Sequence, residues 1–153
     1  MSRMRRGFSL VELVIVIAIL GVIAAIAVPR MSRGAKGAAD TKLQADLSIM
    51  RSAVNMFAAE HDGTYPAVGT FTAQLTTYTD LAGTANATKT GAYIYGPYLE
   101  KIPTLRVGPE TGLNTVGATA GAGTAWVYNA TAGTIVCNTG ALTDDRGVLY
   151  TAY

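Results

Sequence analysis

The sequence predicts an α+β protein in which a long N-terminal α-helix packs on a small head with an antiparallel β-sheet. Three observations predict this class. Residues 13–28 contain no polar or charged side chain, an apolar stripe at helical spacing follows them, and short strand-like pieces between turn residues begin after residue 63. We therefore divide the chain into a basic leader (1–7), an apolar helix (8–28), an amphipathic helix (29–62) and a head (63–153).

The first 28 residues have the charge and length of a membrane anchor. Three arginines precede residue 7, and a helix from Phe8 to Val28 would be about 30 Å long, the thickness of one hydrocarbon core. Because the basic residues precede this span, the positive-inside rule places the N-terminus in the cytoplasm and the head on the opposite side. A cleaved secretory signal is the alternative, since Ala24, Ala25 and Ala27 resemble its small-residue cleavage site.

Glu12 is an acidic residue inside the apolar helix. A carboxylate within a membrane span costs a few kcal/mol on insertion scales, and no Lys or Arg lies within one turn of it. Glu12 either sits protonated or at headgroup depth, or it pairs with a new positive charge. Cutting the chain between Gly7 and Phe8 would create such a charge, the α-amine of Phe8, and pairing is sterically easier between neighbouring subunits than within one helix. The second interpretation makes Glu12 an assembly residue.

The amphipathic helix carries one apolar stripe, whose members recur at intervals of three and four residues. The stripe consists of Leu43, Leu47, Met50, Val54 and Phe57, and the opposite face carries Lys42, Asp46, Arg51 and Asn55. The stripe covers about two heptads, too few for an independent coiled coil, so we expect it to pack against the head.

Both ends of this second helical segment carry specific signals. Pro29 lacks a backbone N–H and clashes with the preceding turn, so it predicts a helix kink. At the other end His61 and Asp62 precede Gly63, which suits a left-handed cap. We therefore expect one helix from Phe8 to Glu60.

The head contains one clear hairpin and two weaker strand candidates. Residues 125–128 and 134–137 are rich in strand-forming side chains and flank a turn-like segment at 129–133. Residues 93–95 and 148–150 are weaker candidates. Cys137, the single cysteine of the chain, cannot form an intramolecular disulfide, and we expect it to be a buried apolar residue on a strand.

The residue inventory argues against an enzyme and against nucleic-acid binding. All five serines precede residue 53, and the chain has one histidine, His61, and one cysteine. A Ser-His-Asp triad cannot be built in the head, and a metal centre of His and Cys lacks ligands. The net charge is only +2, with three arginines in the first six positions, so we expect no nucleic acid as a primary partner.

At the N-terminus the sequence resembles a known family. Residues 5–13 read Arg-Arg-Gly-Phe-Ser-Leu-Val-Glu-Leu and are followed by an unbroken apolar stretch and Pro29. This pattern resembles the N-terminus of type IV pilins and type II secretion pseudopilins. The resemblance implies that a prepilin peptidase cuts after Gly7 and methylates the new amine of Phe8. It also implies that Glu12 pairs with that amine on an adjacent subunit of a filament.

The order of segments in the head resembles the major pseudopilin of type II secretion. The resemblance implies an inner-membrane, single-pass subunit with a periplasmic head that polymerises into a homo-oligomeric pseudopilus driving protein export. Its implied partners are prepilin peptidase, an inner-membrane assembly platform and minor pseudopilins. A type IV pilin for adhesion, motility or DNA uptake is the alternative within the family, and a monomeric membrane-anchored binding or sensing domain is the alternative outside it.

The same resemblance raises calcium as a cofactor. The major pseudopilin commonly ties its C-terminal loop with calcium, and Asp144 and Asp145 are the adjacent acidic residues of that region here. Calcium takes six to eight oxygen ligands, whereas the nearest further candidate, Glu110, is distant in sequence. Asp144 and Asp145 are therefore either calcium ligands or part of a solvated turn, and no other cofactor is expected.

Overall fold

The computed structural model describes residues 7–153, without the side chains of Pro29, Ser32 and Arg33. It separates into two compact units, Met1–Gly37 and Ala38–Tyr153, which are considered one at a time. The basic leader, apart from Gly7, lies outside the described residues. Helix α1 (Leu10–Glu60) begins two residues later than expected and ends at the expected residue. Its backbone is helical through Pro29, and the kink at that residue stays a prediction.

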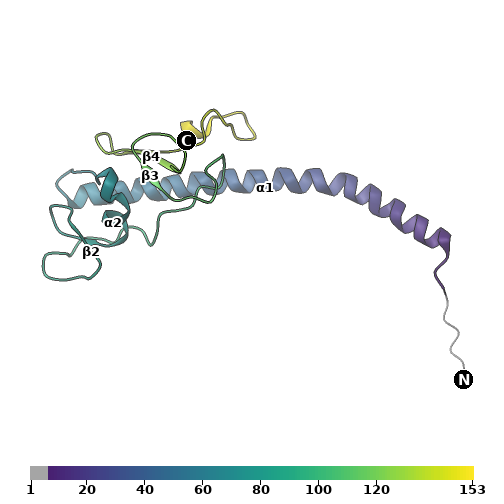
Figure 1. Ribbon diagram of the computed structural model, residues 1–153, viewed down its shortest axis with the longest axis horizontal. Coiled ribbons are helices and arrows are strands. Elements are labelled where there is room, and N and C mark those ends of the chain that lie inside the picture. Colours follow the sequence, from purple (N-terminus) through teal and green to yellow (C-terminus); the bar gives the residue numbers. More distant parts are fainter. Residues whose placement is uncertain (1–6) are drawn as a thin grey trace, which may run out of the picture. The chain divides into compact units, whose positions relative to one another are not determined.

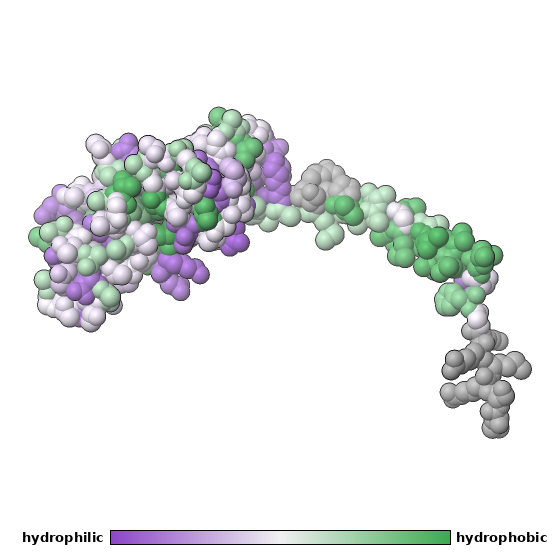
Figure 2. Space-filling model, in the orientation of Figure 1, coloured by the Kyte–Doolittle hydropathy of each residue, from purple (hydrophilic) through white to green (hydrophobic). Residues whose placement is uncertain are grey.

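The first unit contains the apolar part of α1. Residues Leu10–Val28 have a mean hydropathy of 3.0, and none of that segment is buried within the chain. Its length and composition suit a membrane crossing. Figure 2 shows these apolar side chains gathered on the surface of the helix. Their burial therefore requires an apolar environment supplied from outside the chain.

The second unit begins with the amphipathic part of α1, and its apolar stripe is buried as predicted. The five stripe residues are at most 1% exposed. The opposite face differs from the expectation, because Asp46 is only 2% exposed and pairs with Lys42 at 2.6 Å. Arg51 also contacts the head, because its guanidinium donates a hydrogen bond to the carbonyl of Ile135 at 3.2 Å. The head wraps further around α1 than a one-sided stripe suggests.

The C-terminal end of α1 is capped one residue earlier than predicted. Asp62, with φ +52°, takes the left-handed position next to the helix end, and Gly63 follows with φ +80°. The amide of Gly63 donates to the carbonyl of Ala58 at 2.8 Å, which closes the last turn. An aspartate tolerates this conformation better than most residues, because its short polar side chain can bond locally.

Short elements build the head around the helix (Figure 1). A 3-10 turn, η1 (Val68–Thr70), leads into α2 (Phe71–Thr76), and both went unpredicted. Strands β1 (Tyr78–Thr79) and β2 (Ala85–Asn86) form an antiparallel pair. Strands β3 (Val116–Gly117), β4 (Trp126–Asn129) and β5 (Thr134–Cys137) form a second sheet. The chain ends in a second 3-10 turn, η2 (Tyr150–Ala152).

The hairpin of β4 and β5 confirms the expected strand pair, with Trp126 opposite Cys137. The sheet is nevertheless mixed, because β3 pairs with β4 in parallel. The two weaker strand candidates were wrong as regular strands. Residues 93–95 make only isolated bridges, and residues 148–150 make one bridge before turning into η2. Both lie in loops whose conformation depends on contacts with distant segments.

The core of the second unit joins α1 to α2 and the mixed sheet. Trp126 and Tyr128 of β4, together with Ile135 and Cys137 of β5, are at most 1% exposed. The indole N–H of Trp126 donates to the carbonyl of Pro103 at 2.9 Å, which satisfies its one polar atom. The other buried apolar members of the core are Leu43, Leu47, Met50, Ala53, Val54, Phe57, Phe71, Leu75, Leu99, Ile102, Leu105, Ala125 and Tyr150.

The turn between β4 and β5 depends on Gly133. Its φ is +66°, and a Cβ at this position would overlap the ring of Tyr65. We expect Gly133→Ala to lower the free energy of unfolding by about 2 kcal/mol or more, from backbone strain and displacement of the Tyr65 ring. Urea unfolding of the detergent-solubilised chain, followed by the fluorescence of Trp126, measures this loss.

Gly140 provides the matched control for that experiment. It has a similar φ of +60°, but no atom lies within 4 Å of the position of its Cβ. Gly140→Ala therefore reports the backbone strain alone, about 1 kcal/mol. Equal losses from the two substitutions would contradict the packing of Tyr65 on the turn.

Candidate functional site

The predicted cleavage site, Gly7–Phe8, lies on exposed, non-helical backbone just before α1. Phe8 is 82% exposed, and nothing lies within 4 Å of the position that a Cβ of Gly7 would occupy. A peptidase requires an accessible segment outside a helix, and this junction is exposed and non-helical. Cleavage here and N-methylation of Phe8 both stay predictions.

Glu12 accepts a hydrogen bond at the start of its own helix, a contact that was not predicted from the sequence. The backbone N–H of Ser9 donates to Oε2 of Glu12 at 2.9 Å. The carbonyl of Ser9 accepts the amide of Leu13 at 3.2 Å, so Ser9 stands at the N-cap position. The sequence signal for this contact is the pattern Ser-x-x-Glu, a capping box, in which the partner of the glutamate is a backbone amide and not a basic side chain.

The capping geometry places the carboxyl group of Glu12 at the N-terminal end of the helix. The N-terminal end of a helix carries partial positive charge and unpaired amide groups, so a carboxylate in the first turn is stabilised there. The hydrogen bond to Ser9 orients Glu12 toward the N-terminal end of the span, next to Phe8. An amine formed at Phe8 would therefore belong to the residue directly before the one whose amide bonds to Glu12.

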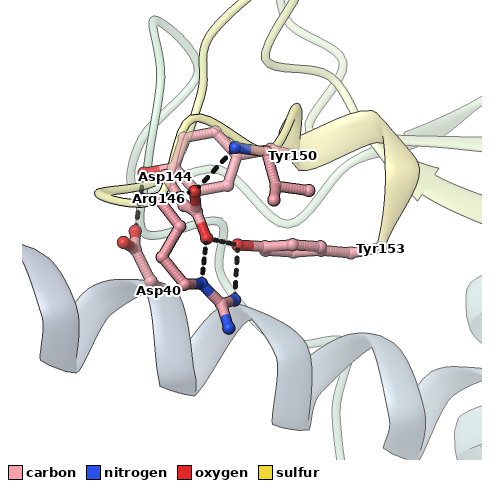
Figure 3. A network of polar contacts seen from close by, with 6 residues as sticks. Asp40, Asp144, Arg146, Tyr150 and Tyr153 are labelled. Atoms are coloured by element: carbon pink, nitrogen blue, oxygen red, sulfur yellow. Dashed lines mark hydrogen bonds and ion pairs between the residues drawn. The ribbon is translucent and has the colours of Figure 1, made fainter.

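A second polar cluster closes the end of the head (Figure 3). Oδ1 of Asp144 accepts hydrogen bonds from the backbone amides of Arg146 and Val148, both at 2.8 Å. Oδ2 accepts from Nε of Arg146 at 2.9 Å and from the hydroxyl of Tyr153. We name this set of contacts between Asp144, Arg146, Val148 and Tyr153 the clasp. The clasp folds residues 144–153 into a closed loop.

Three contacts attach this closed loop to the rest of the second unit. The hydroxyl of Tyr150 donates to Oδ1 of Asp40 at 2.6 Å, and a guanidinium N–H of Arg51 donates to the carbonyl of Tyr153. Both partners belong to α1. The thiol of Cys137 donates to the carbonyl of Tyr150 at 3.2 Å. The clasp is therefore anchored to both α1 and β5.

The clasp changes the acidity of its members. The hydroxyl of Tyr153, assisted by the amide of Val148 and by Arg146, holds the pKa of Asp144 well below its ordinary value. The hydrogen bonds and charge of Tyr153 and Asp144 raise the pKa of Arg146. Burial, followed by the hydrogen bond to Asp40, raises the pKa of Tyr150. The clasp therefore stabilises its members as the ion pair Asp144–Arg146.

The lowered pKa of Asp144 predicts a dependence of stability on pH. A carboxylate whose pKa is lower in the folded chain makes its full contribution to the free energy of unfolding above the ordinary aspartate pKa of about 4. That contribution decreases as the pH falls below this value. We expect the difference in unfolding free energy between the wild-type chain and Asp144→Asn to shrink between pH 6 and pH 3. Urea unfolding at several pH values measures this difference. A difference that grows on acidification would contradict the assignment.

The residues present do not fit a calcium site. Asp144 is 4% exposed, so the expectation of a solvated turn is wrong for this residue, and its two oxygens already bind protein donors. Asp145 is exposed, and Glu110 accepts the amide of Gly123 at 3.0 Å instead. Within residues 7–153, no group of three or more His, Cys, Asp or Glu side chains could hold a metal ion.

The histidine and the cysteine lie in separate parts of the core. Nδ1 of His61 donates to the carbonyl of Phe57 at 2.7 Å, and Nε2 is hydrogen-bonded to the hydroxyl of Thr79 at 3.0 Å. The imidazole also stacks on the ring of Phe57, with 3.8 Å between centroids. Cys137 is 1% exposed on β5 as predicted, and burial raises the pKa of its thiol. Both side chains pack the core.

The comparison with known families addresses the N-terminal segment. The family described as the prokaryotic N-terminal methylation motif matches residues 2–28, which include the Gly7–Phe8 junction and Glu12. Residues 2–28 therefore carry a prokaryotic N-terminal methylation motif. The chain matches no curated protein and no solved structure.

The match to the methylation motif ends at Val28, just before Pro29. It therefore covers the membrane-spanning candidate and none of the second unit. The roles expected for Gly7, Phe8 and Glu12 are compatible with their exposed positions, but each residue's role stays a prediction. The clasp belongs to the head and lies outside the matched residues.

Proposed function

We propose that the chain is a structural subunit of a type II secretion pseudopilus. In this proposal, prepilin peptidase cleaves it after Gly7 and methylates Phe8, and the mature subunits polymerise to drive protein export across the outer membrane. The observation that carries the proposal is the pilin-like N-terminus, in which an exposed apolar helix follows the Gly7–Phe8 junction and holds Glu12 in its first turn.

The apolar helix supports polymerisation on physical grounds. The large apolar side chains from Leu10 to Val28 are 45–77% exposed, and water would disfavour such a surface. A bilayer covers this surface in the precursor, and the helices of neighbouring subunits cover it in a filament. Glu12 is then the polar group that both environments must accommodate, so its partner determines when the subunit leaves the membrane.

The charge pattern supports the orientation of the precursor. The arginines at positions 3, 5 and 6 precede the span, which favours a cytoplasmic N-terminus and a periplasmic head. The cleavage site then faces the cytoplasmic side of the inner membrane, where prepilin peptidase and the assembly platform act on it. Minor pseudopilins are the expected neighbours at the end of the filament.

The head supports a pseudopilus rather than an adhesive pilus. After α1 the chain passes through Tyr65-Pro66, a loop region, Ile102-Pro103 and the β4–β5 hairpin, an order that resembles that of a major pseudopilin. Many adhesive pilins close a C-terminal loop with a disulfide, whereas the single cysteine here is buried and reduced. The clasp closes the corresponding region by polar contacts.

Processing is the first test of this function. We expect mass spectrometry of the mature chain to find N-methylated Phe8 at its N-terminus, because Gly7 is exposed and precedes the helix. Gly7→Ala should be processed, whereas Gly7→Trp should accumulate as precursor because its side chain would crowd the scissile bond. A mature N-terminus after Ala25 or Ala27 would establish an ordinary secretory signal instead.

A deletion strain distinguishes the pseudopilus from the pilus. Loss of the chain should abolish secretion of proteins through the outer membrane, and the wild-type chain should restore it. Overproduced chain should also be recovered in filaments sheared from the cells. Normal secretion combined with loss of surface filaments, motility or DNA uptake would assign a type IV pilus, and the absence of the chain from any filament would assign a monomeric anchor.

A further inference from the structure

The clasp contains a carboxylate whose hydrogen-bonding capacity is filled by the protein. A carboxylate offers about four lone-pair positions. Asp144 meets four donors: two backbone amides at Oδ1, and the guanidinium Nε and the Tyr153 hydroxyl at Oδ2. Because Asp144 is 4% exposed, water contributes little to this arrangement. The positive charge that balances the carboxylate comes from Arg146, two residues along the chain.

We propose that Arg146 is the resident cation of the clasp and closes this part of the head without calcium. The guanidinium contacts Asp144 directly, with Nε 2.9 Å from Oδ2. A calcium ion needs oxygen at about 2.3–2.6 Å, so it could bind Oδ2 only after Arg146 had left. The clasp holds its cation covalently, as part of the chain.

Arg146 also contacts Tyr153, one of the residues that attach the closed loop to α1. The hydroxyl of Tyr153 shares Oδ2 of Asp144 with Arg146 and lies 3.5 Å from Nη2 of the same guanidinium. The carbonyl of Tyr153 in turn accepts the N–H of Arg51. Arg146, Asp144 and Tyr153 therefore form one connected unit, and its closure depends on the folded chain rather than on the calcium concentration.

Hydrogen exchange of the full chain in detergent tests this proposal directly. Peptides covering residues 142–153 report the amides of Arg146 and Val148, which donate to Asp144. We expect identical exchange in excess EGTA and in millimolar calcium chloride. Slower exchange of this segment in calcium would overturn the proposal, and this comparison requires no variant.

Charge removal provides the second part of the experiment. Arg146→Gln should make exchange in residues 142–153 about tenfold faster, as expected for the loss of one charged hydrogen bond, and should leave the β4–β5 peptides unchanged. Exchange of residues 142–153 in Arg146→Lys should be faster than in the wild-type chain and slower than in Arg146→Gln. Arg106→Gln is the matched control, because Arg106 is an exposed arginine outside the clasp. Wild-type exchange in Arg146→Gln would overturn the proposal.

A double variant separates the ion pair from other roles of Arg146. In the Asp144→Asn background the carboxylate charge is already absent, so adding Arg146→Gln should cause little further change. An effect of Arg146→Gln that is equally large in both backgrounds would show that the guanidinium acts elsewhere, and it would contradict the assignment of Arg146 as the counter-charge of Asp144.

Discussion

Glu12→Val is expected to be cleaved and stable in the membrane but absent from filaments. The substitution removes a costly carboxylate from the span, so insertion should become easier. In a filament it would leave the amine of Phe8 without its partner in apolar surroundings, at a cost of about 3–5 kcal/mol. Immunoblots of membranes and of sheared filaments, normalised to the amount of mature subunit, measure the two effects separately.

The capping bond between Ser9 and Glu12 dictates the control for this experiment. Valine removes both the charge and the hydrogen bond to the amide of Ser9, whereas Glu12→Gln keeps an oxygen that can accept that bond. If Glu12 acts by charge pairing, Glu12→Gln should also fail to assemble, and Glu12→Asp should be intermediate. Normal filament yield from Glu12→Gln would assign Glu12 to capping and contradict the pairing.

Tyr150→Phe is expected to lower the free energy of unfolding of the head by about 2 kcal/mol, because it removes a hydrogen bond to a charged group. The phenol donates to Asp40, which is 7% exposed, and its loss leaves that buried carboxylate without this donor. Urea unfolding in detergent, followed by the emission of Trp126, gives the free energy. The tryptophan is the single one of the chain and is fully buried in β4, so its emission reports the head.

Tyr128→Phe is the matched control for this substitution. The hydroxyl of Tyr128 is buried and, among the described residues, is the one buried side-chain polar atom without a hydrogen-bond partner. Burial and the neighbouring Tyr65 raise the pKa of Tyr128 to about 12. Removing this hydroxyl should leave the stability unchanged or slightly higher. Equal losses from the two substitutions would contradict the importance of the bond to Asp40.

The long helix could be predicted because its signals are local. Hydrophobic spacing places Leu43, Leu47 and Phe57 on one face in any helix, and the unbroken apolar run from residue 13 to residue 28 needs no tertiary context. The β4–β5 hairpin was predictable for the same reason, since its two strands are neighbours in sequence. Strand β3 could not be predicted, because its two residues become a strand only by pairing with β4.

Polar contacts could likewise be predicted only where their residues are close in sequence. The contact between Ser9 and Glu12 spans three residues and can be found from a local pattern. Tyr150 and Asp40, in contrast, are 110 residues apart, and no local pattern relates them. Asp144 looked like part of a solvated turn because a charged residue in a Gly-containing segment is usually exposed. Its burial depends on Arg146 and Tyr153 together, which only the folded chain brings to the same carboxylate.

The two attachments of the closed loop to α1 have a mechanical consequence. Asp40 and Arg51 are eleven positions apart, about 16 Å along a helix axis. Asp40 binds Tyr150 of η2, and Arg51 binds Tyr153, which follows η2. A helix that is attached to a second segment at two points resists bending between those points more than an unattached helix does. The closed loop therefore stiffens α1 between Asp40 and Arg51. We expect the loss of either hydrogen bond to make this stretch of α1 easier to bend.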